Sequence, residues 1–230
     1  MNHASRLSRE ELPVRVPAGS VVLEGNVGVP EGAQGVVLFA HGSGSGRHSP
    51  RNRYVAKALR EAGLATLLID LLTPEEEEVD LRTRHLRFDI GLLAERLVGA
   101  TDWLAQNLST QNLAIGYFGA STGAGAALVA AAERPEVVST VVSRGGRPDL
   151  AGPSLSRVAA PTLLIVGGND FPVIDMNREA LEKLHIEKKL EIVPGATHLF
   201  EEPGALEEVA RLAADWFVRY LGSAGNARAT

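Results

Sequence analysis

A serine that could act as a nucleophile lies in residues 113–123, which read LAIGYFGASTG. An apolar, β-prone run ends there in the pattern G-x-S-x-G, and a run of small residues typical of a helix follows directly. This order of strand, sharp turn and helix is the context in which G-x-S-x-G forms a nucleophile elbow. Ser121 would occupy the tip of the turn, while Gly119 and Gly123 would leave room for a strained backbone and a closely passing strand. The pattern predicts nucleophilic attack by the Ser121 hydroxyl.

A serine hydroxyl needs a general base to take its proton, and the base needs an acid to orient it. Asp170 follows the apolar run 162–166 in GGNDFPV, and His198 follows the run 190–193 in PGATHLF. In an open parallel sheet such groups gather beyond the carboxyl ends of the strands. The chain order of nucleophile, acid and histidine is that of the α/β-hydrolase arrangement, and not that of chymotrypsin or subtilisin. We therefore expect Ser121, Asp170 and His198 to form a catalytic triad.

Acyl transfer also needs backbone N–H groups that face the developing negative charge. One is expected from Thr122, directly after the nucleophile. The other is expected from residues 41–46, HGSGSG, where three glycines let the backbone approach a substrate closely. Ser43 is the predicted second donor of this oxyanion hole, with Gly44 next to it. His41 begins the loop and is expected to hydrogen-bond the loop backbone in a structural role.

Strand-like and helix-like segments alternate along most of the chain, which predicts a mostly parallel sheet with helices on both faces. Residues 13–29 are typical of one or two antiparallel edge strands. The expected buried strands are 35–40, 64–70, 113–118, 137–142, 162–166 and 190–193. The expected helices are 50–61, 87–107, the run after the elbow, 173–185 and 204–221. Residues 73–80, TPEEEEVD, are expected to form an acidic loop in which the glutamates are simply solvated.

Four motifs together carry a family resemblance over roughly residues 20–221. They are HGSGSG at 41–46, GASTG at 119–123, GGNDFPV at 167–173 and GATHLF at 195–200. With them the chain resembles a small α/β-hydrolase of the dienelactone-hydrolase-like group. The resemblance implies an α/β fold with a mostly parallel central sheet flanked by helices on both faces. No internal repeat or composition break divides the chain, so we expect a single domain over residues 1–230, with flexible ends at 1–11 and 222–230.

Dienelactone hydrolases proper resemble this chain in layout but use a cysteine nucleophile, and this chain contains no cysteine. The difference favours a serine carboxylesterase that cleaves small esters or lactones through an acyl-enzyme. A thioesterase, an acyltransferase or a perhydrolase could use the same triad, and a non-catalytic binding module could keep the same fold. Residues 143–160 are too short for a large cap domain, so we expect an open site covered only by loops 71–86 and 144–159.

Three arginines are expected on loops near this site. Arg47 follows the glycine-rich loop, and Arg144 and Arg147 follow the strand 137–142. Because the guanidinium group matches carboxylate and phosphate geometry, Arg144 and Arg47 are candidates for binding an anionic group of the substrate. The alternative is a surface arginine or a salt bridge to Asp149 or the acidic loop. Asp175 is the main competitor of Asp170 as the acid, but it is expected inside a helix.

Composition narrows the classes of partner. The chain has 230 residues and a net charge of -5, without the basic block that nucleic-acid binding needs. The lack of cysteine excludes disulfides and cysteine metal sites, and His3, His48, His85 and His185 have no partners at metal spacing, so we expect no metal and no cofactor. The longest apolar runs are shorter than a membrane span, and residues 1–11 lack an apolar signal segment. We expect a cytoplasmic monomer or homodimer that acts on a small-molecule substrate without membrane partners.

Overall fold

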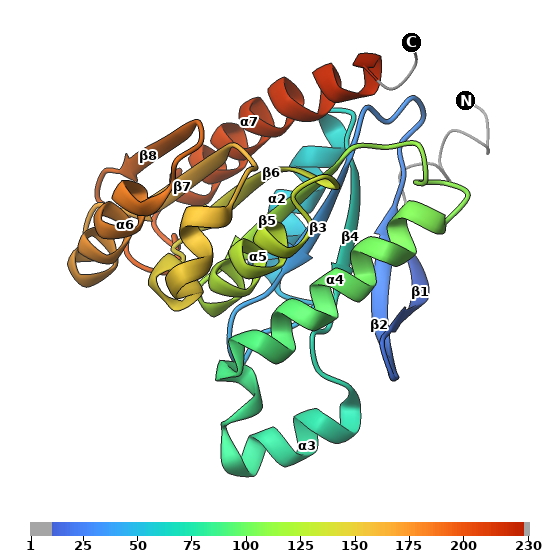
Figure 1. Cartoon of the computed structure of the whole chain (residues 1–230). Helices are drawn as coiled ribbons and strands as arrows, with labels where there is room; N and C mark the ends of the chain where they lie inside the picture. The colour runs from blue at the N-terminus through green and yellow to red at the C-terminus, as the bar shows by residue number, and fades with distance from the viewer. Residues whose placement is uncertain (1–10, 228–230) are drawn as a thin grey trace.

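The computed structural model describes residues 11–227, and within these residues eight strands form one sheet in the order β1-β2-β4-β3-β5-β6-β7-β8 (Figure 1). The strands are β1 (Leu12–Ala18), β2 (Val21–Gly28), β3 (Val36–Ala40), β4 (Ala65–Ile69), β5 (Ile115–Ala120), β6 (Val138–Arg144), β7 (Thr162–Gly167) and β8 (Lys188–Val193). β1 pairs with β2, and β2 with β4, in antiparallel fashion, whereas all neighbours from β4 to β8 are parallel. The mostly parallel sheet with an antiparallel edge is confirmed.

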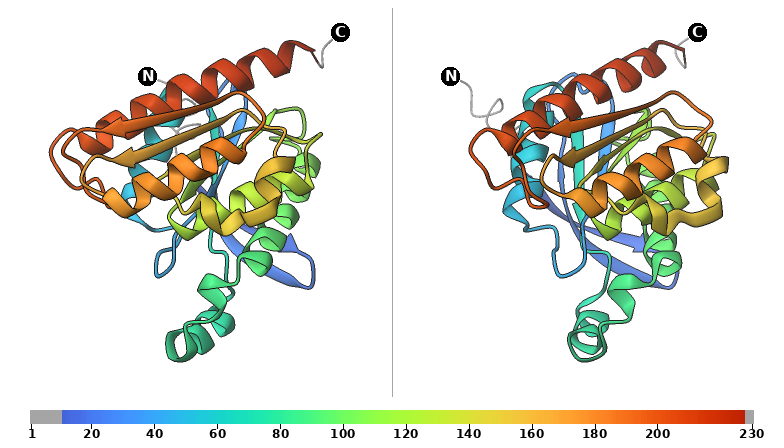
Figure 2. Two further views of the ribbon diagram at one scale, coloured as in Figure 1. Left: turned by 60° about the vertical axis from the view of Figure 1, so that its left-hand side comes forward. Right: turned by 90° about the vertical axis from the view of Figure 1, so that its left-hand side faces the viewer.

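Helices cover both faces of this sheet, as two further views show (Figure 2). The α-helices are α2 (Pro50–Glu61), α3 (Pro74–Thr83), α4 (Ile90–Gln106), α5 (Thr122–Glu133), α6 (Phe171–Lys183) and α7 (Ala205–Ala227). Short 3₁₀ helices are η1 (Leu86–Phe88) and η2 (Pro148–Arg157). Helices α2 and α7 pack on one face, and α4, α5 and α6 belong to the other. In the described part of the chain, no helix is long and apolar enough to cross a membrane.

The buried strand β3 contributes side chains to two hydrophobic cores, one on each face of the sheet. Val37 and Phe39 belong to the core under α2 and α7, whereas Leu38 and Ala40 belong to the core under α4 and α5. Successive side chains of a strand point to opposite faces, so a wholly apolar run is required where both faces are covered. This requirement explains why the central strands were recognisable in the sequence.

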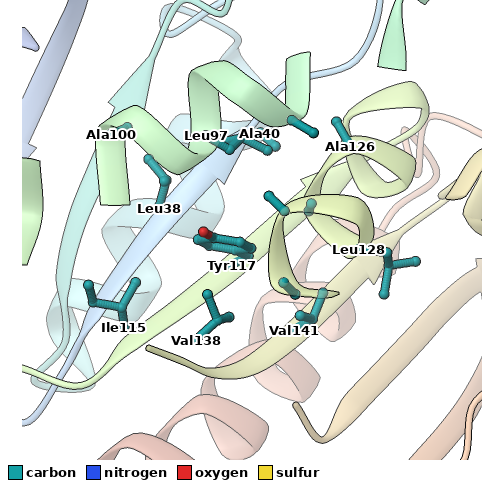
Figure 3. Close-up of a cluster of buried hydrophobic side chains, with 14 of the residues drawn as sticks. Leu38, Ala40, Leu97, Ala100, Ile115, Tyr117, Ala126, Leu128, Val138 and Val141 are labelled. Atoms are coloured by element: carbon teal, nitrogen blue, oxygen red, sulfur yellow. The ribbon is translucent and has the colours of Figure 1, made fainter. Parts of the chain in front are cut away.

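The core under α4 and α5 includes the polar hydroxyl of Tyr117 on β5. Figure 3 shows Tyr117 among Leu38, Leu97 and Val141. The Tyr117 hydroxyl and Thr101 Oγ1 are 2.5 Å apart and share a hydrogen bond. A buried hydroxyl with a partner avoids the cost of an unsatisfied polar group, so Tyr117 can fill this space without destabilising the sheet.

The acidic loop predicted at residues 73–80 is wrong, because this segment begins helix α3. Thr73 caps the helix by accepting a hydrogen bond from the Glu76 N–H, and the Glu76 carboxylate accepts one from the Thr73 N–H. Pro74 occupies the first helical turn, where its missing N–H costs nothing. The glutamates that follow stabilise the positive end of the helix. In Figure 1, α3 extends from the body of the protein below α4.

The structure describes a part of each of the two ends that were expected to be flexible. Glu11 forms an ion pair with Arg60 at 2.9 Å, and α7 continues to Ala227. A single glycine costs a helix only about 1 kcal/mol relative to alanine, so Gly222 does not end α7. Residues 1–10 and 228–230, which complete these two expectations, lie outside the described residues.

A glycine-to-alanine pair of variants tests how tightly α5 enters the sheet. A Cβ on Gly123 would lie 2.3 Å from the Ala40 carbonyl oxygen and 2.4 Å from that of His41, whereas one on Gly91, in α4, would meet nothing closer than 3.5 Å. We expect Gly123→Ala to lower the free energy of unfolding by about 2 kcal/mol through overpacking. Gly91→Ala should leave it unchanged or raise it by up to about 1 kcal/mol. Urea unfolding of both variants measures these free energies. Equal stabilities of the two variants would contradict the close packing of α5 against the loop after β3.

Candidate active site

Ser121 lies in a strained turn between β5 and α5. Its backbone has φ 50° and ψ -123°, a conformation that disfavours any residue with a Cβ. The turn is fixed on both sides: the Ser121 N–H donates to the Arg144 carbonyl at 3.3 Å, and the Ser121 carbonyl accepts from the N–H groups of Ala124 and Arg147. Ser121 occupies the N-cap position of α5, but its hydroxyl makes no capping hydrogen bond. The hydroxyl is therefore available for chemistry.

The glycine-rich loop passes directly against this turn. A Cβ on Gly42 would lie 3.0 Å from the Ser121 Cβ, and one on Gly119 would lie 2.4 Å from the Ala124 Cα. These contacts leave no room for side chains, so the glycines of both motifs are required by backbone approach. The loop after β3 and the turn after β5 consequently form one compact site.

Asp170 and His198, two of the residues predicted to act with Ser121, are brought into contact. The distance from His198 Nδ1 to Asp170 Oδ2 is 2.6 Å. Asp170 follows β7 and His198 follows β8, and the parallel pairing of these strands, up to Gly167 opposite Val193, places both loops at one edge. The Asp170 side chain is 12% exposed and that of His198 is 40% exposed. A largely enclosed carboxylate thus orients a partly exposed imidazole through its Nδ1.

The segment at the end of β6 links this pair to Ser121. The Arg144 carbonyl accepts the Ser121 N–H, and a Cβ on the next residue, Gly145, would lie 3.1 Å from the His198 carbonyl oxygen. The backbone at Arg144 and Gly145 therefore contacts Ser121 on one side and the segment at His198 on the other. Asp175, the competing acid, lies in α6 as expected and pairs with Arg178 at 3.2 Å.

His41 holds the glycine-rich loop as expected. Its Nδ1 lies 2.9 Å from the Gly42 carbonyl oxygen, and its Nε2 lies 3.0 Å from the Leu71 N, whose N–H it accepts. The ring must be neutral with its proton on Nδ1 to make both bonds. Burial lowers the pKa of His41 below its ordinary value of 6.5, although Gly42, Asp70 and Glu77 act in the opposite direction.

The predicted oxyanion donors Thr122 and Ser43 also contact each other. The Ser43 N–H donates to Thr122 Oγ1 at 2.9 Å. The Ser43 amide therefore already has an acceptor here, which the sequence did not indicate. A cavity of about 510 Å³ opens beside these residues, with the start of α2 and part of α3 among its walls.

The three arginines expected near the site differ sharply in environment. Arg47 contacts the Asp70 carboxylate and pairs with Glu24 at 2.6 Å. Arg147 makes two hydrogen bonds to Asp149, at 2.9 and 2.7 Å, so the salt-bridge alternative is confirmed for it. Both guanidinium groups are neutralised by carboxylates.

Arg144 was expected on a loop, but it is the last residue of β6 and only 6% exposed. Its Nη2 donates to Asn52 Oδ1 at 3.1 Å, and its guanidinium carbon lies 5.9 Å from the centre of the Phe200 ring. Burial, together with repulsion from Arg51, lowers the pKa of Arg144 to about 10. Arg51, which follows the Ser49-Pro50 cap at the positive end of α2, is not among the residues that the sequence predicted for this site.

Comparison with known proteins places the chain among hydrolases of this architecture. The model of the dienelactone hydrolase family matches residues 23–221. A crystal structure of a dienelactone hydrolase from Anabaena variabilis is 71% identical, with a TM-score of 0.91 over 92% of this chain and 98% of that chain. An esterase of Pyrococcus furiosus is 20% identical with a TM-score of 0.76 over 96% of this chain and 95% of that chain, which shows the fold alone.

Curated relatives from two strains of Mycobacterium tuberculosis carry the name "Putative phosphoribosyl transferase". They are 60% identical over 212 residues, which is 92% of this chain and 47% of each relative. The chain thus spans about half the length of the curated relatives it matches. Since the family model covers nearly all of the sheet and all four motifs, the chain belongs to the dienelactone hydrolase family.

Proposed function

We propose that the protein is a serine hydrolase that cleaves small carboxylic esters or lactones through an acyl-enzyme intermediate. The observation that carries the proposal is the Asp170–His198 hydrogen bond at the sheet edge where Ser121 occupies a strained turn with an uncommitted hydroxyl. Membership in a hydrolase family supports it. Ser121 is the proposed nucleophile, His198 the general base, and Asp170 the acid that orients the imidazole.

In this mechanism Ser121 Oγ attacks the carbonyl carbon while His198 Nε2 takes the hydroxyl proton. Asp170 keeps the other proton on Nδ1 and stabilises the imidazolium. The proton then passes to the leaving alcohol, and the carbon–oxygen bond of the ester breaks. A water molecule, deprotonated by His198, releases the acid from Ser121 in the second half of the cycle.

The negative charge on the former carbonyl oxygen would be held by the N–H groups of Thr122 and Ser43. For the Ser43 amide this requires an exchange of acceptors, from Thr122 Oγ1 to the substrate oxygen. The exchange retains a hydrogen bond throughout, because the oxyanion is a stronger acceptor than a hydroxyl. The Thr122 side chain would thus hold the donor in place until the charge develops.

Other acyl-transfer reactions use the same groups. A thioesterase, acyltransferase or perhydrolase would differ only in leaving group or acceptor, so a panel of thioesters, alcohols and peroxide separates these activities from ester hydrolysis. A phosphoribosyl transferase activity is suggested by the name of relatives about twice as long, and this chain spans 47% of each of them. Covalent labelling of Ser121 by a fluorophosphonate would exclude a purely binding role.

The first test is hydrolysis of short p-nitrophenyl esters by wild type, Ser121→Ala and Ser45→Ala. Removal of a triad nucleophile costs on the order of 10⁴–10⁶ in rate, so Ser121→Ala should fall to background. Ser45→Ala removes a hydroxyl of the glycine-rich loop that lines the neighbouring cavity and should retain activity. Equal rates for wild type and Ser121→Ala would refute the assignment.

The strain at Ser121 predicts a gain of stability when function is removed. Glycine adopts positive φ without steric cost, whereas alanine keeps the strain of the native turn. We expect Ser121→Gly to be inactive yet about 1 kcal/mol more stable than Ser121→Ala. Urea unfolding measures the difference, and an Ala variant as stable as the Gly variant would show that the turn is unstrained.

The neutral state of His41 predicts a loss of stability in acid. Because burial lowers its pKa in the native state, the unfolded chain binds a proton more readily, and stability falls as the pH drops below 6.5. The slope due to this group is at most about 1.4 kcal/mol per pH unit. His41→Gln should lose this component, whereas His85→Gln, at an exposed site, should keep it. Unfolding in urea between pH 7.5 and 5.5 checks both, and identical profiles for wild type and His41→Gln would contradict the prediction.

A further inference from the structure

Asn177 is a fully buried amide that the proposed mechanism does not use. It lies in α6 and has no exposed surface. Its Nδ2 donates to the Val173 carbonyl at 2.8 Å, one turn earlier in the same helix, and to the Gly146 carbonyl at 3.0 Å. The second hydrogen bond leaves the helix and joins α6 to the segment that follows β6.

Asn177 has a free-energy cost at this position. Its Oδ1 is buried and has no hydrogen-bond partner among the described residues, and a buried polar atom without a partner destabilises the folded state. Asparagine is also a weak helix former. The Val173 carbonyl accepts a backbone N–H within the regular hydrogen-bond pattern of the helix in any case. The hydrogen bond to Gly146 is therefore the contribution that an apolar side chain could not replace.

The Gly146 carbonyl belongs to a backbone segment, residues 144–147, that holds the turn of the proposed nucleophile. The Arg144 carbonyl accepts the Ser121 N–H at 3.3 Å, and the Arg147 N–H donates to the Ser121 carbonyl at 3.0 Å. Gly146 lies between these two contacts. A side chain that fixes the Gly146 carbonyl therefore fixes the backbone from which both hydrogen bonds to Ser121 are made.

The same segment passes closely beside the imidazole. Gly145 has φ 52°, and a Cβ there would lie 3.1 Å from the His198 carbonyl oxygen and 3.6 Å from His198 Nδ1. A Cβ on Gly146 would overlap with Ser143 Oγ and lie 2.6 Å from the Ala124 Cβ. The backbone at these two glycines leaves no room for side chains, so a shift of it would move one wall of the site.

Helix α6 also carries the acid of the proposed triad. Asp170 is the N-cap residue of α6, but its side chain makes no capping hydrogen bond and instead contacts His198. Asn177 follows Asp170 by seven residues, which is about two helical turns, so both lie on one side of the helix. One hydrogen bond thus joins α6 to the imidazole, and the other joins it to Gly146.

We propose that Asn177 is a positioning residue that sets the spacing between the nucleophile turn and the Asp170–His198 pair. It does so through the Gly146 carbonyl, by holding residues 144–147 against α6. The inference rests on the proposed function, because it concerns the geometry of the same triad. Asn177 is fully buried and acts only through the backbone. A misplacement of about 1 Å at the reacting groups can reduce the rate about 100-fold.

The kinetic test replaces the amide by an apolar group of similar shape in Asn177→Leu. We expect kcat and kcat/KM for short p-nitrophenyl esters to fall by the same factor, about 10 to 100, with KM little changed. The rate at which a fluorophosphonate labels Ser121 should fall equally. Asn177→Ser keeps a hydroxyl that can bond the Val173 carbonyl but is too short to reach Gly146. It should behave like Asn177→Leu, and it serves as the test if the leucine variant does not fold.

Ala180→Gly is the matched control. Ala180 is buried in the same helix, three residues after Asn177, and its side chain belongs to the apolar core. Glycine weakens a helix relative to alanine, so this variant loses stability but keeps the hydrogen bond to Gly146. It should retain the kcat of wild type at temperatures where it is folded. A wild-type kcat in Asn177→Leu, or an equal fall in Asn177→Leu and Ala180→Gly, would overturn the inference.

Hydrogen–deuterium exchange separates a failure of this inference from a failure of the proposed function, because it needs no substrate. The N–H groups that hold the Ser121 turn are hydrogen-bonded, and local opening makes such groups exchange faster. We expect faster exchange in peptides containing residues 121–124 and 144–147 in both Asn177 variants, but not in Ala180→Gly. Unchanged exchange in both Asn177 variants would overturn the inference. If wild type cleaves no ester and is not labelled, the proposed function fails, and exchange still decides whether Asn177 holds the turn.

Discussion

The close crossing of the loop after β3 over the turn after β5 is the constraint on which the site depends. The carbonyl groups of Ala40 and His41 occupy the space where a Cβ of Gly123 would lie. This contact fixes the first turn of α5 against the loop, and Ser121 must then adopt a positive φ to connect β5 to that helix. The strain is sustained because hydrogen bonds from Ala124 and Arg147 to the Ser121 carbonyl hold the turn. A relaxed turn would withdraw the hydroxyl from the sheet edge.

The same crossing explains which parts of the molecule could be predicted from the sequence. A glycine that is required by backbone contact is visible as a motif in the sequence. An apolar run that is buried on both faces is visible in the same way. The elbow and the central strands could therefore be predicted. Helix α3 was missed although Thr73, Pro74 and Glu76 form a complete capping pattern. The run of glutamates was interpreted only as solvated charge, whereas at the start of a helix it is stabilising.

Environments that form through distant contacts could not be predicted in this way. The three arginines look equivalent in the sequence, but Arg47 and Arg147 meet carboxylates while Arg144 is enclosed by α2 and the loop after β8. The Arg147–Asp149 pair is local and could be expected from the sequence, whereas the partners of Arg47 and Arg144 lie on other elements. Likewise, the sequence placed Ser43 in the correct loop but did not reveal that its N–H is bound by Thr122.

The burial of Arg144 is difficult to explain as a purely structural feature. A buried ionic group is often replaced by apolar residues of similar volume without loss of stability, and Phe200 and the core beneath α2 would accommodate an apolar side chain at this position. Asn52, itself buried, gives the guanidinium a single acceptor and no charge. The charge of Arg51 and the positive end of the α2 dipole both raise the free-energy cost of burying this cation. Arg144 is therefore buried at a cost in folding free energy that the hydrogen bond to Asn52 and the contact with the Phe200 ring offset only in part.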